Sequence, residues 1–222
     1  DFIYHDVADT ALVLEKPQFL LAVPVSRGVF VTRQPMKTNG VPQFIKVDNG
    51  EPTSNPTCVE WSPDGDVLYI GYANGKLVRL KNFNSAWQPD QMDISKSAYA
   101  LQRTVIHTAG GPIMDIDVDY SMGRGGIDNP ASTKVAIAVG GYGGNYKVLV
   151  SDDAANAPGF GSFQNVWNVP SELEGMPVYS IVMDVVDTDK LMVGTEYGIW
   201  YSDNGGDSWT QSNNGDMMRV PV

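Results

Sequence analysis

The sequence is poor in histidine and cysteine and has no long apolar runs. Two histidines and one cysteine in 222 residues leave little material for a Ser-His-Asp or Cys-His catalytic set, or for a zinc site with three or four His or Cys ligands. Cys58 has no second cysteine for an internal disulfide, and we expect it to be a small buried apolar side chain. No run reaches the roughly 18 apolar residues that a membrane-spanning helix requires, so no membrane insertion is expected.

Basic residues are also scarce. The chain has 15 Lys and Arg against 26 Asp and Glu, which gives a formal net charge of −11. Proteins that bind nucleic acid carry a basic footprint, so a nucleic-acid partner is not expected. Docking on anionic lipid is disfavoured for the same reason. The simplest role for the excess acid is a solubilising surface.

Glycine and proline, in contrast, are plentiful and spread along the chain, which indicates many turns between apolar strands. One unit recurs, a short apolar strand, a glycine turn and a second strand. It is found at 21–31, 68–78, 137–150 and 191–201, with aligned glycines at Gly28, Gly75, Gly144 and Gly198. We expect each of these glycines to supply a positive φ in a hairpin turn. Their spacing of 47, 69 and 54 residues is typical of β-propeller blades.

Further strands flank these units. Strands are expected before three of them, at 57–61, 113–118 and 178–183. An aromatic residue follows each unit and is expected to begin an outer strand: Phe44, Trp87, Phe163 and Trp209. Four strands per repeat is the pattern of a propeller blade.

The predicted fold is therefore all-β, a β-propeller of four-stranded antiparallel blades. The expected blades span residues 10–50, 52–106, 111–168 and 176–216. Residues 218–222 resemble 174–178, where the preceding blade starts, and residues 217–222 are expected to begin a further blade. Because an open arc leaves bare sheet edges, we expect these blades to be part of a larger propeller, or to be completed by a partner chain.

The segment from Ser202 to Trp209, SDNGGDSW, carries a family resemblance. It resembles the Asp-box, or BNR repeat, written S-x-D-x-G-x-T-W: Ser202, Gly206 and Trp209 fit, Ser208 replaces Thr and Asn204 replaces Asp. A second, interrupted box is formed by residues 151–153 and 161–163. The WSPDG segment at 61–65 looks more like the WD40 type of propeller.

This resemblance implies a propeller but leaves the activity open. Asp-box repeats occur in sialidases, xyloglucan-active glycosidases, sortilin-type receptors and a plant photosystem II assembly factor, so in enzymes and non-enzymes alike. The family's box lies at the blade periphery, which implies a structural role for it here. The similarity to exported BNR-repeat proteins implies a secreted or cell-surface bacterial protein, with a cytoplasmic WD40-like scaffold as the alternative.

Three aspartates, Asp115, Asp117 and Asp119, alternate with Ile116 and Val118. On a strand their carboxylates would share one face, about 7 Å apart. On an innermost strand they could line the central channel, either solvated or holding calcium, a hard cation that prefers oxygen ligands. No other cofactor or metal is expected.

The same strands offer candidates for glycoside hydrolysis, which needs two carboxylates about 5 to 9.5 Å apart. Asp117, Asp119 and Asp184 are strand-borne acids at similar places in neighbouring units. A sialidase is disfavoured because the arginines are scattered. A glycoside hydrolase or carbohydrate-binding propeller of the xyloglucanase type is the alternative function.

Aromatic residues in the hairpins provide the leading hypothesis. Tyr72, Tyr142 and Tyr197 fall in the predicted turns, and aromatic faces bind sugars or partner proteins. Packing between blades is the competing role for such side chains. We predict a non-catalytic interaction module that binds protein or glycan partners.

Overall fold

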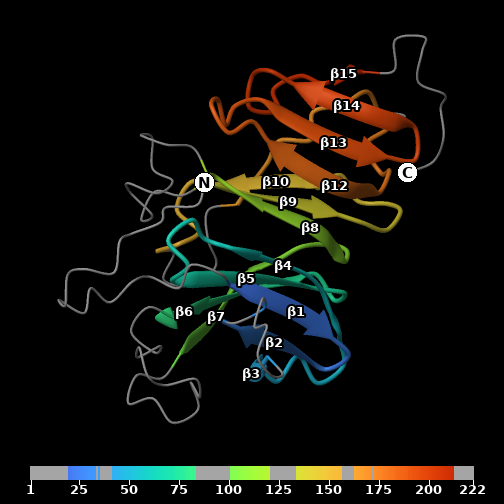
Figure 1. Cartoon of the computed structure of the whole chain (residues 1–222). Coiled ribbons are helices and arrows are strands. Elements are labelled where there is room, and N and C mark those ends of the chain that lie inside the picture. Colours follow the sequence, from blue (N-terminus) through green and yellow to red (C-terminus); the bar gives the residue numbers. More distant parts are fainter. Residues whose placement is uncertain are drawn as a thin grey trace, which may run out of the picture.

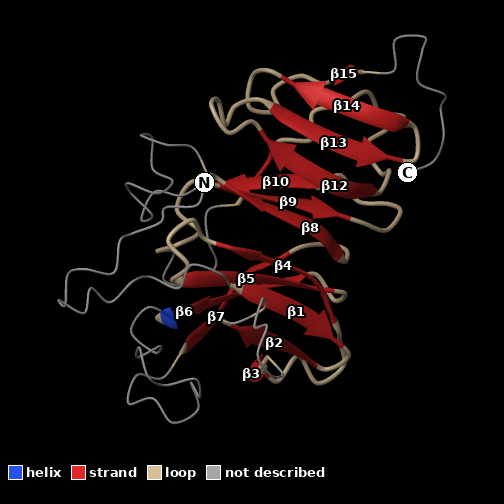
Figure 2. Ribbon diagram, in the orientation of Figure 1, coloured by secondary structure: helices blue, strands red, loops and turns tan. Residues whose placement is uncertain are grey.

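The computed structural model describes residues 20–33, 35, 42–83, 101–120, 134–156, 163–171 and 173–212. These residues form fifteen strands joined by loops and turns (Figure 2). The strands make four antiparallel sheets, which follow one another in chain order from blue to red (Figure 1). The chain is an all-β partial β-propeller with four blades, as the sequence predicts.

The first two sheets are referred to as blades 1 and 2. Blade 1 has three described strands in the order β1 (Leu21–Val25), β2 (Gly28–Thr32), β3 (Ile45–Asp48). Blade 2 has the order β4 (Pro56–Trp61), β5 (Val67–Tyr72), β6 (Lys76–Lys81), β7 (Gln102–Thr108). Residues 10–19 of the range expected for blade 1 lie outside the described residues, as does Trp87.

Blades 3 and 4 repeat the four-stranded pattern. Blade 3 contains β8 (Ile113–Val118), β9 (Val135–Val139), β10 (Val148–Ser151) and β11 (Gln164–Asn165). Blade 4 contains β12 (Val178–Met183), β13 (Leu191–Thr195), β14 (Gly198–Ser202) and β15 (Thr210–Gln211). The sheets lie within the expected blade ranges, except that β7 runs two residues past 106. Residues 217–222, expected to begin a further blade, are not among those described.

The innermost strands β4, β8 and β12 can be aligned residue by residue. Each has a register irregularity after its first residue, at Pro56, Ile113 and Val178. Counting from that irregularity, the pairing registers place one residue from each of the first three strands side by side, and this row of three occupies the equivalent position in each of these blades. The rows are Glu60–Tyr69–Arg79, Asp117–Ala136–Val150 and Val182–Met192–Tyr201.

Apolar layers fill the spaces between the blades. Successive residues of a strand point to opposite faces of its sheet, so a central strand contributes to two layers. In β5, Leu68 and Ile70 pack with Val29 of blade 1, whereas Tyr69 packs with Ile116 of blade 3. Strand β9 does the same, with Ile137 facing blade 2 and Ala138 facing blade 4.

Three of the four aligned glycines have the predicted positive φ: Gly75 (82°), Gly144 (71°) and Gly198 (97°). The prediction is wrong for Gly28, where the preceding Arg27 takes the positive φ of 66°. A Cβ on Gly28 would lie 2.6 Å from the carbonyl oxygen of Asp48. Glycine is required there because β3 approaches the hairpin closely, not because of its φ.

The Asp-box segment folds as the compact turn that its residues favour. The Ser202 hydroxyl accepts the backbone N–H of Gly206 at 2.8 Å, and the Asn204 side chain accepts the N–H of Ser208 at 3.1 Å. The buried indole of Trp209 donates to the carbonyl of Val166 in blade 3 at 2.7 Å. Its ring meets Trp167 edge to face, with centroids 5.1 Å apart. The box therefore fastens blade 4 to blade 3, consistent with a structural role.

Candidate functional site

A cluster of tyrosines around Glu196 joins blades 3 and 4 at one end of their sheets. Tyr142 lies in the loop between β9 and β10, Glu196 in the turn between β13 and β14, and Tyr179 in β12. The Tyr142 hydroxyl donates to both carboxylate oxygens of Glu196 at 2.5 Å. The Tyr179 hydroxyl donates to Oε1 at 2.7 Å. Two phenols from different blades thus share one carboxylate.

The loop that carries Tyr142 is itself fastened at several points. The Gly140 N–H donates to the carbonyl of Pro112, and the Gly143 N–H donates to that of Gly175 in the connection to blade 4, both at 2.8 Å. The buried ammonium group of Lys147 donates to the carbonyl of Gly141 at 2.6 Å. Tyr142 is therefore positioned before any ligand arrives, which reduces the entropic cost of binding.

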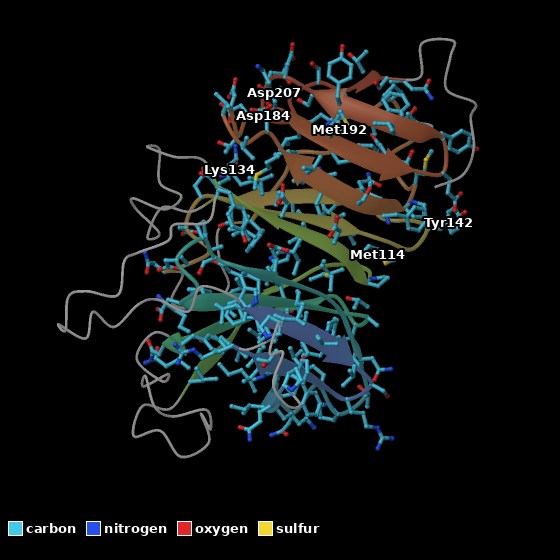
Figure 3. The ribbon with its side chains drawn as sticks, viewed as in Figure 1. Met114, Lys134, Tyr142, Asp184, Met192 and Asp207 are labelled. Carbon is cyan, nitrogen blue, oxygen red and sulfur yellow. The ribbon has the colours of Figure 1, made fainter. Side chains whose placement is uncertain are left out.

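These tyrosines are nevertheless open to solvent, as the sequence predicts for Tyr142 and Tyr197. Tyr142 is 76% exposed and Tyr197 is 55% exposed. Figure 3 shows Tyr142 at the right-hand end of the sheets, opposite the end that carries Asp184 and Asp207. Exposed rings held by hydrogen bonds form a surface that contributes little to the core.

The hydrogen bonds also fix the charge of the cluster. The phenol donors Tyr142 and Tyr179 lower the pKa of Glu196, so this carboxylate is ionised at neutral pH. The hydrogen bond from Tyr179 to Glu196 raises the pKa of Tyr179 to about 12, so this phenol keeps its proton at neutral pH. The cluster is a negative charge flanked by aromatic rings.

Tyr72 does not belong to this surface, and the prediction that it lies at the surface is wrong. It is the last residue of β5 and is 0% exposed. Its hydroxyl donates to Asp48, whose other oxygen accepts from Arg103 Nε at 3.1 Å. Tyr72 shares one face of β5 with Leu68 and Ile70, and the close packing of blade 1 covers that face.

Asp115 and Asp117 share a face, as predicted, but that face is directed at blade 4. Their Oδ2 atoms accept the backbone N–H groups of Ile181 at 2.9 Å and of Met183 at 2.5 Å. Strand β12 is the edge of its sheet, and edge strands present unpaired N–H groups. The two carboxylates satisfy two of these groups.

Burial raises the pKa of both Asp115 and Asp117, and the backbone hydrogen bonds only partly oppose this shift. Asp119 follows the end of β8 and is buried. Among the described residues no three His, Cys, Asp or Glu side chains are grouped as metal ligands would be. Asp115 and Asp117 accept backbone N–H groups of β12 in this structure, and calcium binding by the three aspartates stays a prediction.

The glycosidase candidates are likewise engaged in local structure. The Asp184 carboxylate accepts the N–H groups of Val186 and Asp187 at 2.8 and 2.9 Å, and these bonds lower its pKa. Asp117 also accepts the N–H of Val118 at 3.0 Å, so both of its oxygens accept backbone bonds. Asp184 therefore stabilises the loop after β12, and Asp117 joins blade 3 to blade 4.

Sequence reasoning missed Glu196 and Tyr179. Glu196 adjoins Tyr197 in the same turn, and its partner Tyr142 stands 54 residues earlier, in the corresponding loop of the preceding unit. Comparison of equivalent turns between neighbouring repeats would have paired them. Glu60 was also missed; burial raises its pKa, and the Tyr120 hydroxyl donates to it at 2.9 Å.

No helix in the described part of the chain is long and apolar enough to cross a membrane. No protein-family model matches the chain, and no curated protein matches its sequence. The Asp-box likeness thus rests on the sequence segment and its turn geometry.

Two solved structures are similar in fold. The WD40 domain of Toxoplasma gondii coronin is 12% identical with a TM-score of 0.53, and the match covers 86% of this chain and 42% of that one. An ancestral GH74 enzyme is 18% identical with a TM-score of 0.50, and the match covers 90% of this chain and 24% of that one. The chain thus spans less than half the length of either neighbour. Identities this low show the fold alone, a β-propeller.

Proposed function

We propose that this propeller segment is a non-catalytic interaction module that binds protein or glycan partners over the tyrosine cluster of blades 3 and 4. The observation that carries the proposal is Tyr142, which is 76% exposed and yet held by Glu196 of the neighbouring blade. Fixed aromatic side chains at a surface are typical energetic centres of binding sites. The similarity to a WD40 domain supports an interaction role.

We also propose that a further blade of the same polypeptide covers the outer face of blade 4. Val182, Met192 and Tyr201 form an exposed apolar row there. The equivalent rows of blades 2 and 3 are covered by the next blade along the chain. The small share of each neighbour's length that this chain spans supports the same proposal.

For its location we propose a secreted or cell-surface protein. Support comes from the resemblance of residues 202–209 to the boxes of exported BNR-repeat proteins. Fractionation of the native organism with an antibody against this segment tests it, because recovery in the cytoplasm alone would contradict it.

Binding is tested by probing the protein against a glycan array and a peptide array. Tyr142→Ala and Tyr197→Ala are expected to lower affinity for the selected ligands by about tenfold each, as for central aromatic contacts. Tyr201→Ala is the matched control, because this exposed tyrosine lies on β14 outside the cluster. Equal losses in all three variants would contradict the proposed site.

A glycoside hydrolase is the second candidate function. Burial raises the pKa of Asp117 and loop hydrogen bonds lower that of Asp184, and such a split is typical of an acid paired with an ionised carboxylate. The GH74 neighbour supports it. Against it, an acid at Asp117 would have to give up a backbone hydrogen bond to hold its proton. Turnover of xyloglucan oligosaccharides that Asp117→Asn or Asp184→Asn abolishes would replace the proposed function with this one.

A further inference from the structure

Several exposed or half-exposed ion pairs join the blades, and Glu196 differs from the carboxylates in them. Between blades 1 and 2, Arg103 pairs with Asp48 at 3.1 Å and with Glu51 at 2.6 Å. Between blades 3 and 4, Lys134 pairs with Asp189 at 2.8 Å. Within the part of the chain that the structure describes, Glu196 receives only the two phenols and no Lys, Arg or His.

We propose that Glu196, Tyr142 and Tyr197 bind the cationic side chain of a peptide partner, a lysine or an arginine. This inference rests on the proposed function and specifies its ligand. The carboxylate supplies the opposite charge, and the exposed rings supply faces that attract a cation. The aliphatic part of a lysine or arginine side chain can pack along the same rings.

The hydrogen-bonding pattern favours such a cation over a sugar. The Tyr142 and Tyr179 hydroxyls already donate to Glu196. The centre of the site therefore offers acceptors and ring faces but few free donors. A cation needs only acceptors, whereas a sugar hydroxyl is recognised by donors and acceptors together. The net charge of −11 would also steer a basic segment to this surface.

The position of Tyr197 supports the same ligand. It directly follows Glu196 in the turn, and its side chain is 55% exposed. Its backbone is held by Gln211, whose side-chain amide donates to the Tyr197 carbonyl at 2.7 Å. A cation beside Glu196 would therefore meet rings from both blades.

The test probes the 222-residue protein with a random-sequence peptide array and a glycan array in parallel. We expect selection of peptides with lysine or arginine at one fixed position, and weaker binding as salt rises. Glu196→Gln keeps an acceptor and removes the charge, and should lower affinity for the selected peptide by about tenfold. Asp207→Asn, the same charge change at the opposite end of blade 4 (Figure 3), should leave it unchanged.

Other outcomes of the two arrays would contradict the cation proposal, the proposed function or both. Selection of glycans alone would overturn the cation proposal and leave the proposed function in place, whereas silence on both arrays would contradict both. Equal losses of affinity in Glu196→Gln and Asp207→Asn would show that binding depends on the net charge of the protein and not on Glu196, which would overturn the proposal.

Tyr197→Ala leaves the hydrogen bonds of Glu196 intact and is expected to lower the affinity for the peptide severalfold. Unchanged affinity in that variant would also overturn the proposal. Unfolding curves that match the wild type show that each variant is folded.

Discussion

The outer face of blade 4 differs from the equivalent faces of blades 2 and 3, although all three are built in the same register. In blade 2 the row contains Tyr69, which is 0% exposed against blade 3. In blade 3 it contains Ala136, also 0% exposed, against blade 4. In blade 4 the row is Val182, Met192 and Tyr201, which are 52%, 44% and 40% exposed.

The difference shows what a blade requires from its neighbour. Covered faces combine apolar side chains with groups that satisfy the neighbour's edge strand, as Asp115 and Asp117 do for β12. The open face keeps the apolar character but has no neighbour in the described residues. A contiguous apolar face on a protein surface marks an interaction site, which supports a further blade at this position.

The largest expected effect is a difference in stability loss between two tyrosines, Tyr69 and Tyr201, which lie in the equivalent rows of blades 2 and 4. Tyr69→Ala removes a fully buried ring between blades 2 and 3 and should lower the free energy of unfolding by about 3–5 kcal/mol. Tyr201→Ala on the open face should cost less than about 1 kcal/mol. Urea unfolding followed by fluorescence measures both. Similar losses in the 222-residue chain would show that the chain itself covers this face, which would contradict the proposed further blade.

Asp117 tests the edge contact between blades 3 and 4. Asp117→Ala leaves the N–H groups of Met183 and Val118 without their acceptor and should cost about 2–4 kcal/mol. Asp117→Asn keeps only one of the two acceptor oxygens but removes a charge that burial disfavours, so it should cost less than the alanine variant, about 1–2 kcal/mol. The comparison uses the same unfolding assay. A larger loss in the asparagine variant would show that the charge itself holds the blades together.

Two buried tyrosines on opposite faces of β5 test the hydrogen bond between Tyr72 and Asp48 at the boundary of blades 1 and 2. Tyr72→Phe removes the hydrogen bond to Asp48 and should cost about 1–2 kcal/mol. Tyr69→Phe is the matched control, because its buried hydroxyl has no hydrogen-bond partner among the described residues. That variant should be neutral or slightly more stable. Thermal unfolding at fixed pH measures both variants. A larger loss of stability in Tyr69→Phe than in Tyr72→Phe would contradict the assigned hydrogen bonds.

The smallest expected effect is a change of pH dependence. Burial opposes ionisation of Glu51, but hydrogen bonds from Lys76 and Arg103 outweigh it and lower the pKa. The stability that Glu51 contributes is therefore present above its ordinary pKa, about 4.5, and is lost as the pH falls through the folded-state value. Glu51→Gln should flatten the acid side of the stability curve, by less than about 1 kcal/mol. Parallel curves for the two proteins would exclude this contribution.

Much of the fold could be predicted because its signals are local. The hairpins at 21–32 and 191–202 are short-range patterns, as are the aromatic residues directly before three outer strands, Phe44, Phe163 and Trp209. The burial of Tyr72 was also predictable, since it continues the alternation of Leu68 and Ile70, but its nearness to the turn misled the prediction.

The rest depends on contacts between repeats. The face of Asp117 follows from alternation, but its acceptor role depends on the edge of β12, 66 residues further along the chain. Glu196 is one of many acids in the sequence, and only the packing of blade 4 on blade 3 brings it to Tyr142. Such contacts depend on the angle between sheets, which no local pattern specifies.

Thiol labelling tests the contrast between open and covered faces most directly. Met192→Cys and Ala136→Cys place a cysteine at equivalent positions of blades 4 and 3; Cys58 itself is a weak competitor, because burial raises its pKa to about 12. In the folded 222-residue chain the Met192→Cys thiol should react at a rate close to that of an unfolded chain, while the Ala136→Cys thiol should be protected by at least about 100-fold. Equal protection at the two positions would contradict the arrangement of blades described above.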